Sequence, residues 1–245
     1  MLHGFQAKNI GLLPFANEFY LHQKTSIAED KNIIFVFPQA PRGGLLNVSQ
    51  WWEIDLVKWL NAANGDQAVL AKLLRERPEG LAVARKNLSL LMDQICDKYN
   101  LISHENLVLA GFSQGAITVM DVALDRLNSY IADEKSGGPP AGITMLSGAP
   151  TVIEEWSAVL KKYTDLVKKM NNNKKYKKLK VFISHGLLDP VLPYVVSGWT
   201  KSLLEQTPDV VELQYVSHNE GHSFGCAETK NKIFSFWLDA LIGAC

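Results

Sequence analysis

The amino-acid sequence predicts an α/β fold in which helices cover both faces of a mostly parallel central sheet. Short runs of apolar residues alternate along the chain with longer amphipathic stretches. Most of these runs are unbroken rather than alternating, which is typical of strands buried on both faces. Neither an internal repeat nor a linker interrupts the 245 residues, so we interpret residues 1–245 as a single domain.

Candidate strands are runs of apolar residues rich in β-branched and aromatic side chains. The last of them alternates apolar and polar residues, which favours a place near the edge of the sheet. The five runs are Ile33–Phe37, which Pro38 ends, Leu107–Ala110, Ile143–Leu146, Val181–Ile183 and Val211–Val216.

Candidate helices are stretches whose apolar residues recur three or four positions apart. The longest places Leu81, Leu88 and Ile95 on one face. The four stretches are Leu81–Tyr99, Gln114–Leu127, Val195–Leu204 and Ile233–Ile242.

The span 151–180 looks like a helical insertion. Thr151 and Glu154 have the spacing of a capping box. Between Lys161 and Lys180 there are nine lysines and one acid, Asp165. Two interpretations stay open: a solvated helix face followed by a loop, or a cap helix beside a site, with lysines facing anionic lipid or an acidic partner. The apolar stripe consists of Val152, Trp156, Val159, Tyr163, Leu166 and Met170, and Asn171–Asn173 ends it.

Composition argues against several classes of protein. Lys plus Arg and Asp plus Glu both number 25, so the balanced charge provides no overall field for binding nucleic acid. Cys96, Cys226 and Cys245 are far apart and suggest neither a disulfide framework nor a metal site. The start of the chain, Met1–Phe5, does not resemble a signal peptide, and no run of about 18 apolar residues exists. We therefore expect a cytoplasmic protein without a membrane span.

The pentapeptide Gly111-Phe112-Ser113-Gln114-Gly115 is the most informative motif. It matches G-x-S-x-G between a candidate strand and a candidate helix, the context in which a serine stands exposed on a sharp turn. Glycines are needed on both sides because side chains there would collide with neighbouring backbone. The motif predicts a nucleophilic serine, Ser113, at a helix N-terminus; the alternative is a simple Gly/Ser-rich turn.

A serine nucleophile needs a base and an acid, which follow in the order serine, acid, histidine in folds with this turn. His222 lies in the loop after the last candidate strand and is our candidate base, while His218 is a weaker one. His185 is expected to shape a turn. The candidate acid is Asp189, whose task would be to orient the imidazole; the alternative role is a helix N-cap.

Acyl transfer also needs donors for the oxyanion. The backbone N–H groups of Gln114 and Phe5 are the candidates, and His3 is expected to make structural hydrogen bonds. A zinc site at His218 and His222 is disfavoured, because Gly221 makes a helix there unfavourable.

Taken in order, these motifs resemble the carboxylesterase and phospholipase family of α/β-hydrolases, which includes acyl-protein thioesterases and lysophospholipases. The resemblance rests on Leu2–Gly4, Pro38–Pro41 with Asn47 and Trp51–Ile54, Gly111–Ala116, His185–Pro193, and Gly221-His222. Family members usually have one or two strands before the His-Gly loop, whereas this chain begins two residues before it. Gln6 and Glu53 stand where the family generally has glycine and aspartate, and 151–180 is longer than in the smallest members.

The resemblance implies hydrolysis of carboxylic esters or thioesters through an acyl-enzyme, with no metal or organic cofactor. Side chains that could line an acyl channel, or could equally be ordinary packing, are Trp51, Trp52, Val191, Leu192 and Phe224. Two alternatives are kept: another hydrolase on this scaffold, such as a peptidase or polyester depolymerase, and a non-catalytic binding module.

Overall fold

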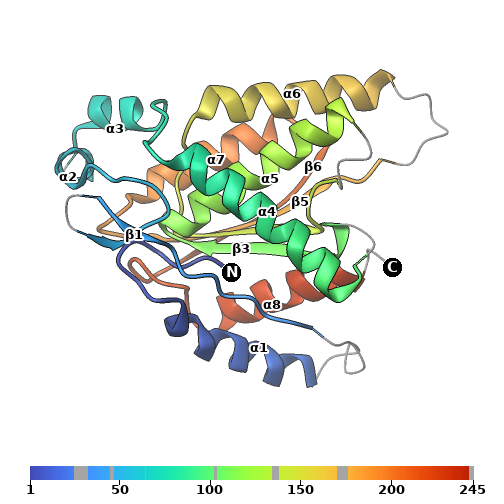
Figure 1. The fold of residues 1–245 in the computed structure, drawn as a ribbon. Helices are drawn as coiled ribbons and strands as arrows, with labels where there is room; N and C mark the ends of the chain where they lie inside the picture. Colours follow the sequence, from blue (N-terminus) through green and yellow to red (C-terminus); the bar gives the residue numbers. More distant parts are fainter. Residues whose placement is uncertain are drawn as a thin grey trace.

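The protein folds around a parallel four-stranded sheet with the strand order β3-β4-β5-β6 (Figure 1). The computed structural model describes residues 1–24, 33–44, 47–63, 65–101, 104–133, 138–169 and 176–242. A separate antiparallel pair, β1 with β2, lies beside the carboxyl end of the sheet. The strands are β1 (Arg42–Gly43), β2 (Val48–Ser49), β3 (Val108–Phe112), β4 (Gly142–Leu146), β5 (Leu179–Gly186) and β6 (Val211–His218).

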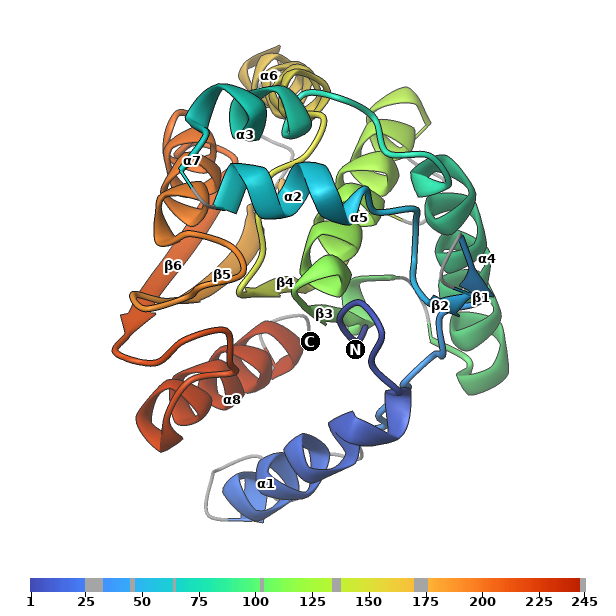
Figure 2. The ribbon, with the colours of Figure 1, turned by 90° about the vertical axis from the view of Figure 1, so that its left-hand side faces the viewer.

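Helices cover both faces of this sheet, as the alternation of apolar runs and amphipathic stretches predicted (Figure 1). Helices α4 to α7 lie above the sheet in that view, and α1 and α8 lie below it. Figure 2 looks onto the edge where the strands end, with α2 and α3 above it. The helices are α1 (Leu13–Lys24), α2 (Leu56–Ala63), α3 (Gln67–Leu73), α4 (Leu81–Tyr99), α5 (Gln114–Ala132), α6 (Ile153–Lys169), α7 (Tyr194–Glu205) and α8 (Ala227–Ile242), with 3-10 turns η1 (Asn9–Leu12) and η2 (His104–Asn106).

Two apolar clusters hold the layers together, one on each face of the sheet. The upper cluster surrounds α5, in which every residue from Gln114 to Leu124 is buried. The lower cluster is aromatic and packs Phe15 and Phe19 of α1 against Phe234 and Trp237 of α8. Since α5 is enclosed by its neighbours, its first turn is held rigidly at the end of β3.

Four of the five predicted strands are confirmed as β3, β4, β5 and β6, and β6 is at the edge, as its alternating pattern predicted. The prediction for Ile33–Phe37 was wrong, because this segment is not a strand. Its neighbour Met1 donates one hydrogen bond to Val36 O, and Leu2 forms a single bridge to Gly111. A strand requires successive ladder hydrogen bonds to its neighbour, and the single hydrogen bond from Met1 to Val36 O does not provide them.

All four predicted helices are present, as α4, α5, α7 and α8, and the helix predicted within 151–180, with its stripe from Val152 to Met170, is α6. The capping box was wrong in detail: α6 begins at Ile153, so Val152, with φ 40°, precedes the helix in place of Thr151. Of the predicted stripe, Trp156 and Tyr163 are buried, and Leu160 is buried beside them. Met170 and Asn171–Asn173 lie outside the described residues.

At the junction of β3 and α5 three backbone segments approach closely. Leu2 donates its N–H to Ala110 O at 2.8 Å and accepts the Phe112 N–H at 3.1 Å. A Cβ on Gly115 would lie 2.5 Å from Leu2 O and 2.6 Å from His3 O. A Cβ on Gly111 would collide with the backbone of Gly115. Both glycines of the G-x-S-x-G motif are therefore required by packing.

We expect Gly115→Ala to lower the free energy of unfolding by about 1–3 kcal/mol, because its Cβ would push the N-terminal segment away from α5. Gly198→Ala in α7 is the matched control, since nothing lies within 4 Å of the position its Cβ would take. That control should stabilise the protein by about 0.5–1 kcal/mol through helix propensity. Urea unfolding measures both, and a Gly115→Ala variant as stable as the control would contradict the packing argument.

Candidate active site

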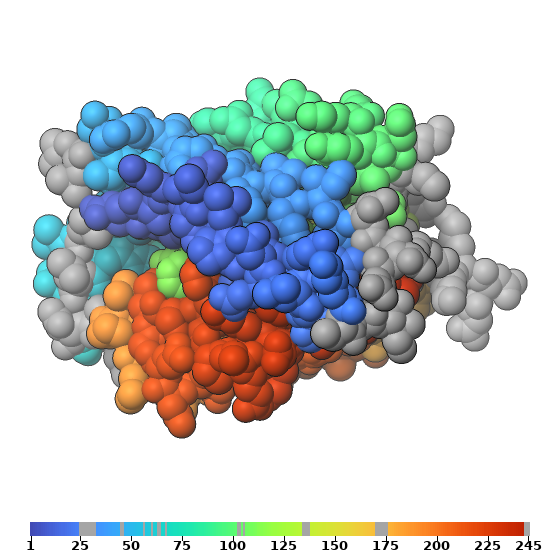
Figure 3. All heavy atoms as spheres, turned by 90° about the horizontal axis from the view of Figure 1, so that it is seen from below, coloured from blue at the N-terminus to red at the C-terminus, as the bar shows by residue number. Residues whose placement is uncertain are grey.

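Ser113 occupies a sharp turn between β3 and α5. Its φ of 55° and ψ of −121° are unfavourable for a residue with a side chain, at a cost of about 1–3 kcal/mol. The Ser113 N–H donates to Leu146 O at 2.8 Å, which ties the turn to the end of β4. The side chain is half-buried, at the N-terminus of a 19-residue helix whose dipole favours negative charge. Figure 3 shows green atoms, with the colour of this turn, exposed between the blue and orange segments.

His222 and Asp189 are joined directly, as their places in the sequence suggested. His222 Nδ1 lies 2.7 Å from Asp189 Oδ2. Because a carboxylate only accepts, Nδ1 carries the proton, and Nε2 is left as the basic nitrogen of the ring. The His222 ring packs 4.8 Å, centroid to centroid, from the ring of Phe112, the residue before Ser113. Among the described residues, Ser113 Oγ makes no hydrogen bond to His222.

Asp189 is buried and held by its own loop. Its Oδ1 accepts the backbone N–H groups of Val191 at 2.8 Å and of Leu192 at 2.9 Å. Burial raises the pKa of the carboxyl, but hydrogen bonds from His185, His222 and the Leu192 N–H outweigh it, so the pKa lies well below its ordinary value. Asp189 does not cap α7, which begins after Pro193. Its carboxylate is thus kept charged and oriented.

The other two histidines of the candidate set are placed differently. His218, the weaker candidate base, is buried at the end of β6, in register with Gly186. Neither ring nitrogen of His218 has a hydrogen-bond partner among the described residues, and burial lowers its pKa. His185 is fully buried at the end of β5 and contacts the Asp189 loop. Of the three histidines, only His222 has both a partly exposed ring and a contact as short as 2.7 Å with Asp189.

Backbone hydrogen bonds connect the loops that carry Asp189 and His222. Leu187 N–H donates to His218 O at 2.8 Å, and Leu188 N–H donates to Glu220 O at 3.2 Å. Ser147, with φ 47°, donates its hydroxyl to Ser223 O at 3.1 Å, next to His222. The pairing of β5 with β6 therefore continues past the strand ends and fixes the two loops relative to each other.

The candidate oxyanion donors lie on both sides of Ser113. Gln114 is the first residue of α5, so its N–H has no acceptor within the helix. Phe5 follows Gly4, and a Cβ on Gly4 would lie 3.2 Å from Ser113 Cβ. The loop turns at Gln6, where φ is 60°. A substrate carbonyl at Ser113 would have backbone from both segments nearby.

The expectation that His3 makes structural hydrogen bonds agrees with its contacts. His3 is buried and accepts the Ala40 N–H through Nε2 at 3.0 Å, so Nδ1 carries the proton and donates to Gly4 O at 2.8 Å. Burial lowers its pKa, which favours this neutral form. His3 O in turn accepts the indole N–H of Trp51 at 2.8 Å. His3 therefore joins the Gly4 loop to Ala40 and Trp51.

The Gln114 side chain holds Trp51 and Trp52 against the turn between β3 and α5 that carries Ser113. Its Oε1 accepts the Trp51 N–H at 3.0 Å, and its Nε2 donates to Trp52 O at 2.7 Å. The Trp52 indole donates to Thr118 Oγ1 at 3.1 Å. This role of the Gln114 side chain was not predicted from the sequence, where the only signal for it was the position of Gln114 next to the serine.

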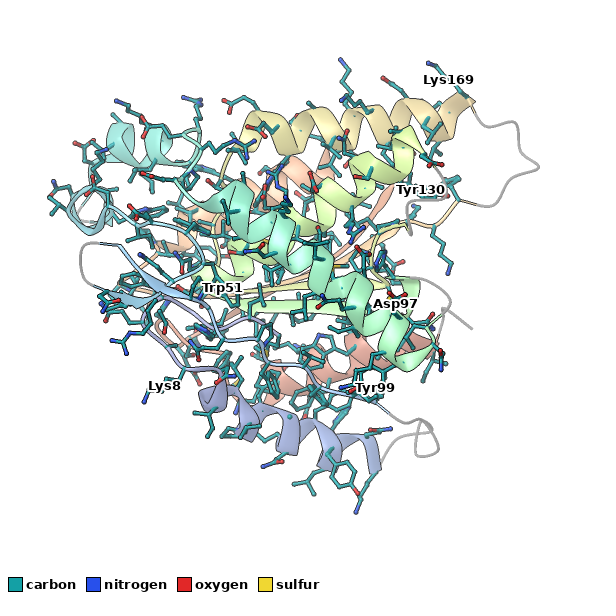
Figure 4. All side chains as sticks on the ribbon, in the orientation of Figure 1. Lys8, Trp51, Asp97, Tyr99, Tyr130 and Lys169 are labelled. Carbon is teal, nitrogen blue, oxygen red and sulfur yellow. The ribbon has the colours of Figure 1, made fainter. Side chains whose placement is uncertain are left out.

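The proposed substrate-lining residues differ in exposure. Trp51, Trp52 and Leu192 are buried, whereas Val191 is 52% exposed. Phe224 is partly buried, and its ring lies 4.5 Å from that of Phe112. Figure 4 shows Trp51 inside the molecule near β1, on the side where the strands end. A role of these residues in binding substrate stays a prediction.

The described lysines of 161–180 lie away from this edge of the sheet. Helix α6 links β4 to β5 and packs on α5, so it begins near the carboxyl ends of the strands and runs back toward their amino ends. Figure 4 shows Lys169 at the far end of α6 from Trp51. Lys161, Lys162 and Lys168 face solvent. Contact of these lysines with lipid or an acidic partner stays a prediction, and it would lie away from Ser113.

Neither a metal site nor a membrane span is found in the described parts of the chain. No group of three His, Cys, Asp or Glu side chains there is arranged to hold a metal ion. No helix in these parts is both long and apolar enough to cross a membrane.

A protein-family model described as Phospholipase/Carboxylesterase matches residues 2–232. No curated protein sequence matches the chain.

Solved structures with similar folds share low sequence identity with this chain. SOBER1 from Arabidopsis thaliana superposes with a TM-score of 0.64 at 20% identity, covering 98% of this chain and 96% of that one. Acyl-protein thioesterase 2 from Zea mays gives 0.63 at 16% identity, covering 98% and 91%. A carboxylesterase from Bacillus cereus gives 0.56 at 17% identity, covering 98% and 86%. These likenesses establish the α/β-hydrolase fold.

The lowered pKa of Asp189 predicts a pH-dependent contribution to stability. A carboxyl whose pKa is lower in the folded than in the unfolded chain stabilises the fold above its unfolded pKa, about 4, and loses this effect as the pH falls. We expect the difference in unfolding free energy between wild type and Asp189→Asn to be largest at neutral pH and to shrink below about pH 4. Urea unfolding from pH 7 to pH 3 measures this, and a constant difference would contradict it.

Proposed function

Because the chain belongs to the phospholipase/carboxylesterase family and is an ester hydrolase with the α/β-hydrolase fold, we propose that it cleaves carboxylic esters or thioesters through a Ser113–His222–Asp189 triad. The observation that carries this proposal is the 2.7 Å contact between His222 Nδ1 and Asp189 Oδ2, beside a serine on a strained strand-to-helix turn. The contact fixes the tautomer that a general base requires.

In the proposed reaction, Ser113 Oγ attacks the acyl carbonyl carbon while His222 Nε2 accepts the hydroxyl proton. The C=O π bond opens, and negative charge develops on the carbonyl oxygen. Collapse of this tetrahedral intermediate breaks the bond to the alcohol or thiol, which leaves with the proton from His222. Water then attacks the acyl-enzyme by the same route and releases the carboxylic acid and Ser113. Asp189 stays ionised throughout, since its lowered pKa favours the charged form.

Backbone N–H groups of Gln114 and Phe5 would stabilise the oxyanion. Support comes from the position of Gln114 at the start of α5 and from the close approach of Gly4 to Ser113. A fixed donor of this kind is worth about 2.7–4 kcal/mol in the transition state. The Gln114 side chain and His3 support these donors indirectly, because they hold the surrounding loops.

The extension to thioesters rests on the fold shared with the Zea mays protein, whose name gives acyl-protein thioester hydrolysis. For the acyl group we propose a path past Val191, bounded by the buried Trp51, Trp52 and Leu192. We also propose that residues 1–245 form a single domain. The free thiols of Cys96 and Cys226 support a reducing, cytoplasmic location.

Ser113→Ala and His222→Ala should each lower kcat for a short-chain ester by about 10⁴-fold or more, because nucleophile and base act as a unit. Both variants should fold, since neither side chain belongs to the apolar core. Near-UV circular dichroism verifies folding, and steady-state hydrolysis of p-nitrophenyl and thioester substrates gives kcat.

His218→Ala is the comparison variant for the choice of base, since His218 does not bond to Asp189 among the described residues. Its kcat should fall far less than that of His222→Ala. A larger loss in a folded His218→Ala protein would overturn the assignment of His222, and near-wild-type activity of Ser113→Ala would overturn that of the nucleophile.

A further inference from the structure

A second histidine contacts the same carboxylate oxygen as His222. His185 Nε2 lies 2.8 Å from Leu192 O and 3.3 Å from Asp189 Oδ2. The His185 ring is fully buried at the end of β5. Asp189 Oδ2 therefore lies between two imidazoles, one half-buried and one enclosed.

The surroundings of His185 define its tautomer. Leu192 O and Asp189 Oδ2 both act only as acceptors, so the ring nitrogen between them carries the proton. Nδ1 is then unprotonated in the neutral ring, and among the described residues it has no hydrogen-bond partner. Leaving that acceptor unpaired in the interior is unfavourable, because it has lost its hydrogen bonds to water. His185 thus provides one shared donor at a cost that a simple apolar residue would avoid.

We propose that His185 is a positioning residue that fixes the Asp189 loop and shares in orienting the carboxylate for His222. The proposal rests on the proposed function of the triad. One Nε2–H joins Leu192 O and Asp189 Oδ2, while the Leu192 N–H bonds to Asp189 Oδ1. The loop is therefore closed on both carboxylate oxygens, and Asp189 cannot rotate without breaking several hydrogen bonds.

The same contact moderates the charge that His222 experiences. A donor on Oδ2 takes up part of the negative charge that would otherwise stabilise the His222 imidazolium. Removing this donor leaves more negative charge on Asp189 Oδ2, and we expect the acid limb of kcat/KM to move to higher pH. The other ionisable groups beside His185 are Tyr194, whose ring lies 6.1 Å away on α7, and His218 at the end of β6; Glu220, in the loop after β6, acts on His218. These groups are unchanged by substitution of His185.

The test compares His185→Leu with His185→Gln. Leucine removes the donor, while the glutamine amide restores an N–H at the end of a side chain of similar reach. We expect His185→Leu to lower kcat by about 10- to 100-fold with little change in KM, and to move the acid limb of kcat/KM upward by about 0.5 pH unit. His185→Gln should recover most of both.

His104 provides the matched control because it is also a buried histidine, with Nε2 3.0 Å from Asp93 Oδ1, but at η2 beside α4. His104→Leu should reduce stability without changing the pH profile. A purely structural role for His185 would give the same result for His185→Leu, with kcat and the acid limb unchanged at a temperature where the variant is folded. That result would overturn the proposal.

Failure of the proposed function can be recognised separately by proton NMR in a Ser113→Ala background, where no turnover is needed. The His222 Nδ1–H bonded to Asp189 should give a low-field signal that shifts or broadens on adding His185→Leu and returns with His185→Gln. An unaltered signal in His185→Leu would contradict the positioning role. An inactive wild-type enzyme with the expected shift would contradict only the proposed function.

Discussion

The hydrogen bond between His222 Nδ1 and Asp189 Oδ2 is the interaction on which the site depends. It joins residues 33 positions apart, and nothing local to either loop would bring them together. What brings them together is the parallel pairing of β5 with β6, which runs from Leu179 to Gly186 and continues in the loop hydrogen bonds beyond. Because the carboxyl ends of parallel strands meet at one edge, loops after neighbouring strands can share a carboxylate and an imidazole. The sheet is thus the rigid part that permits a precise contact between two loops.

The N-terminal segment also lies at the carboxyl ends of the strands, next to β3. Leu2 lies next to β3 and is hydrogen-bonded to it, which brings Gly4 close to Ser113. The Gln114 side chain hydrogen-bonds the backbone of Trp51 and Trp52 and so holds them beside the turn between β3 and α5. Glycine at position 115 makes this approach feasible, since any Cβ there would meet the Leu2 and His3 carbonyls. Ser113 is held in an unfavourable conformation by these surroundings, and a strained residue at such a point is commonly functional. The residues that form the turn between β3 and α5 therefore also determine how much space is open around Ser113.

Sequence patterns could predict what is determined locally or by order along the chain. Buried strands such as β4 consist of unbroken apolar residues, and Ser113 is marked by flanking glycines between strand and helix. Asp189 and His222 were predicted from their order after Ser113, and their roles stay a prediction. Ile33–Phe37 was misjudged because its composition suits a strand, but its pairing depends on a distant neighbour. Helix α1 was not predicted, because apolar residues lie on its exposed side as well as on its buried side. Leu13, Tyr20 and Leu21 are exposed, so the sequence shows no distinct apolar face.

The finer contacts could not be predicted because they depend on side-chain direction. The bonds from Gln114 to Trp51 and Trp52, and from His185 to Leu192 O, exist only once the loops are placed. Polar residues of this kind look interchangeable in a sequence, although each satisfies buried backbone groups here.

We propose that Ser113 is a nucleophile activated by His222. The most direct measurement is the rate of covalent labelling by a fluorophosphonate, with the modified residue located by peptide mass spectrometry. We expect stoichiometric phosphonylation of Ser113 and labelling that is slower by orders of magnitude when His222 is replaced by alanine. Modification at another residue, or equal rates with and without the imidazole, would contradict it.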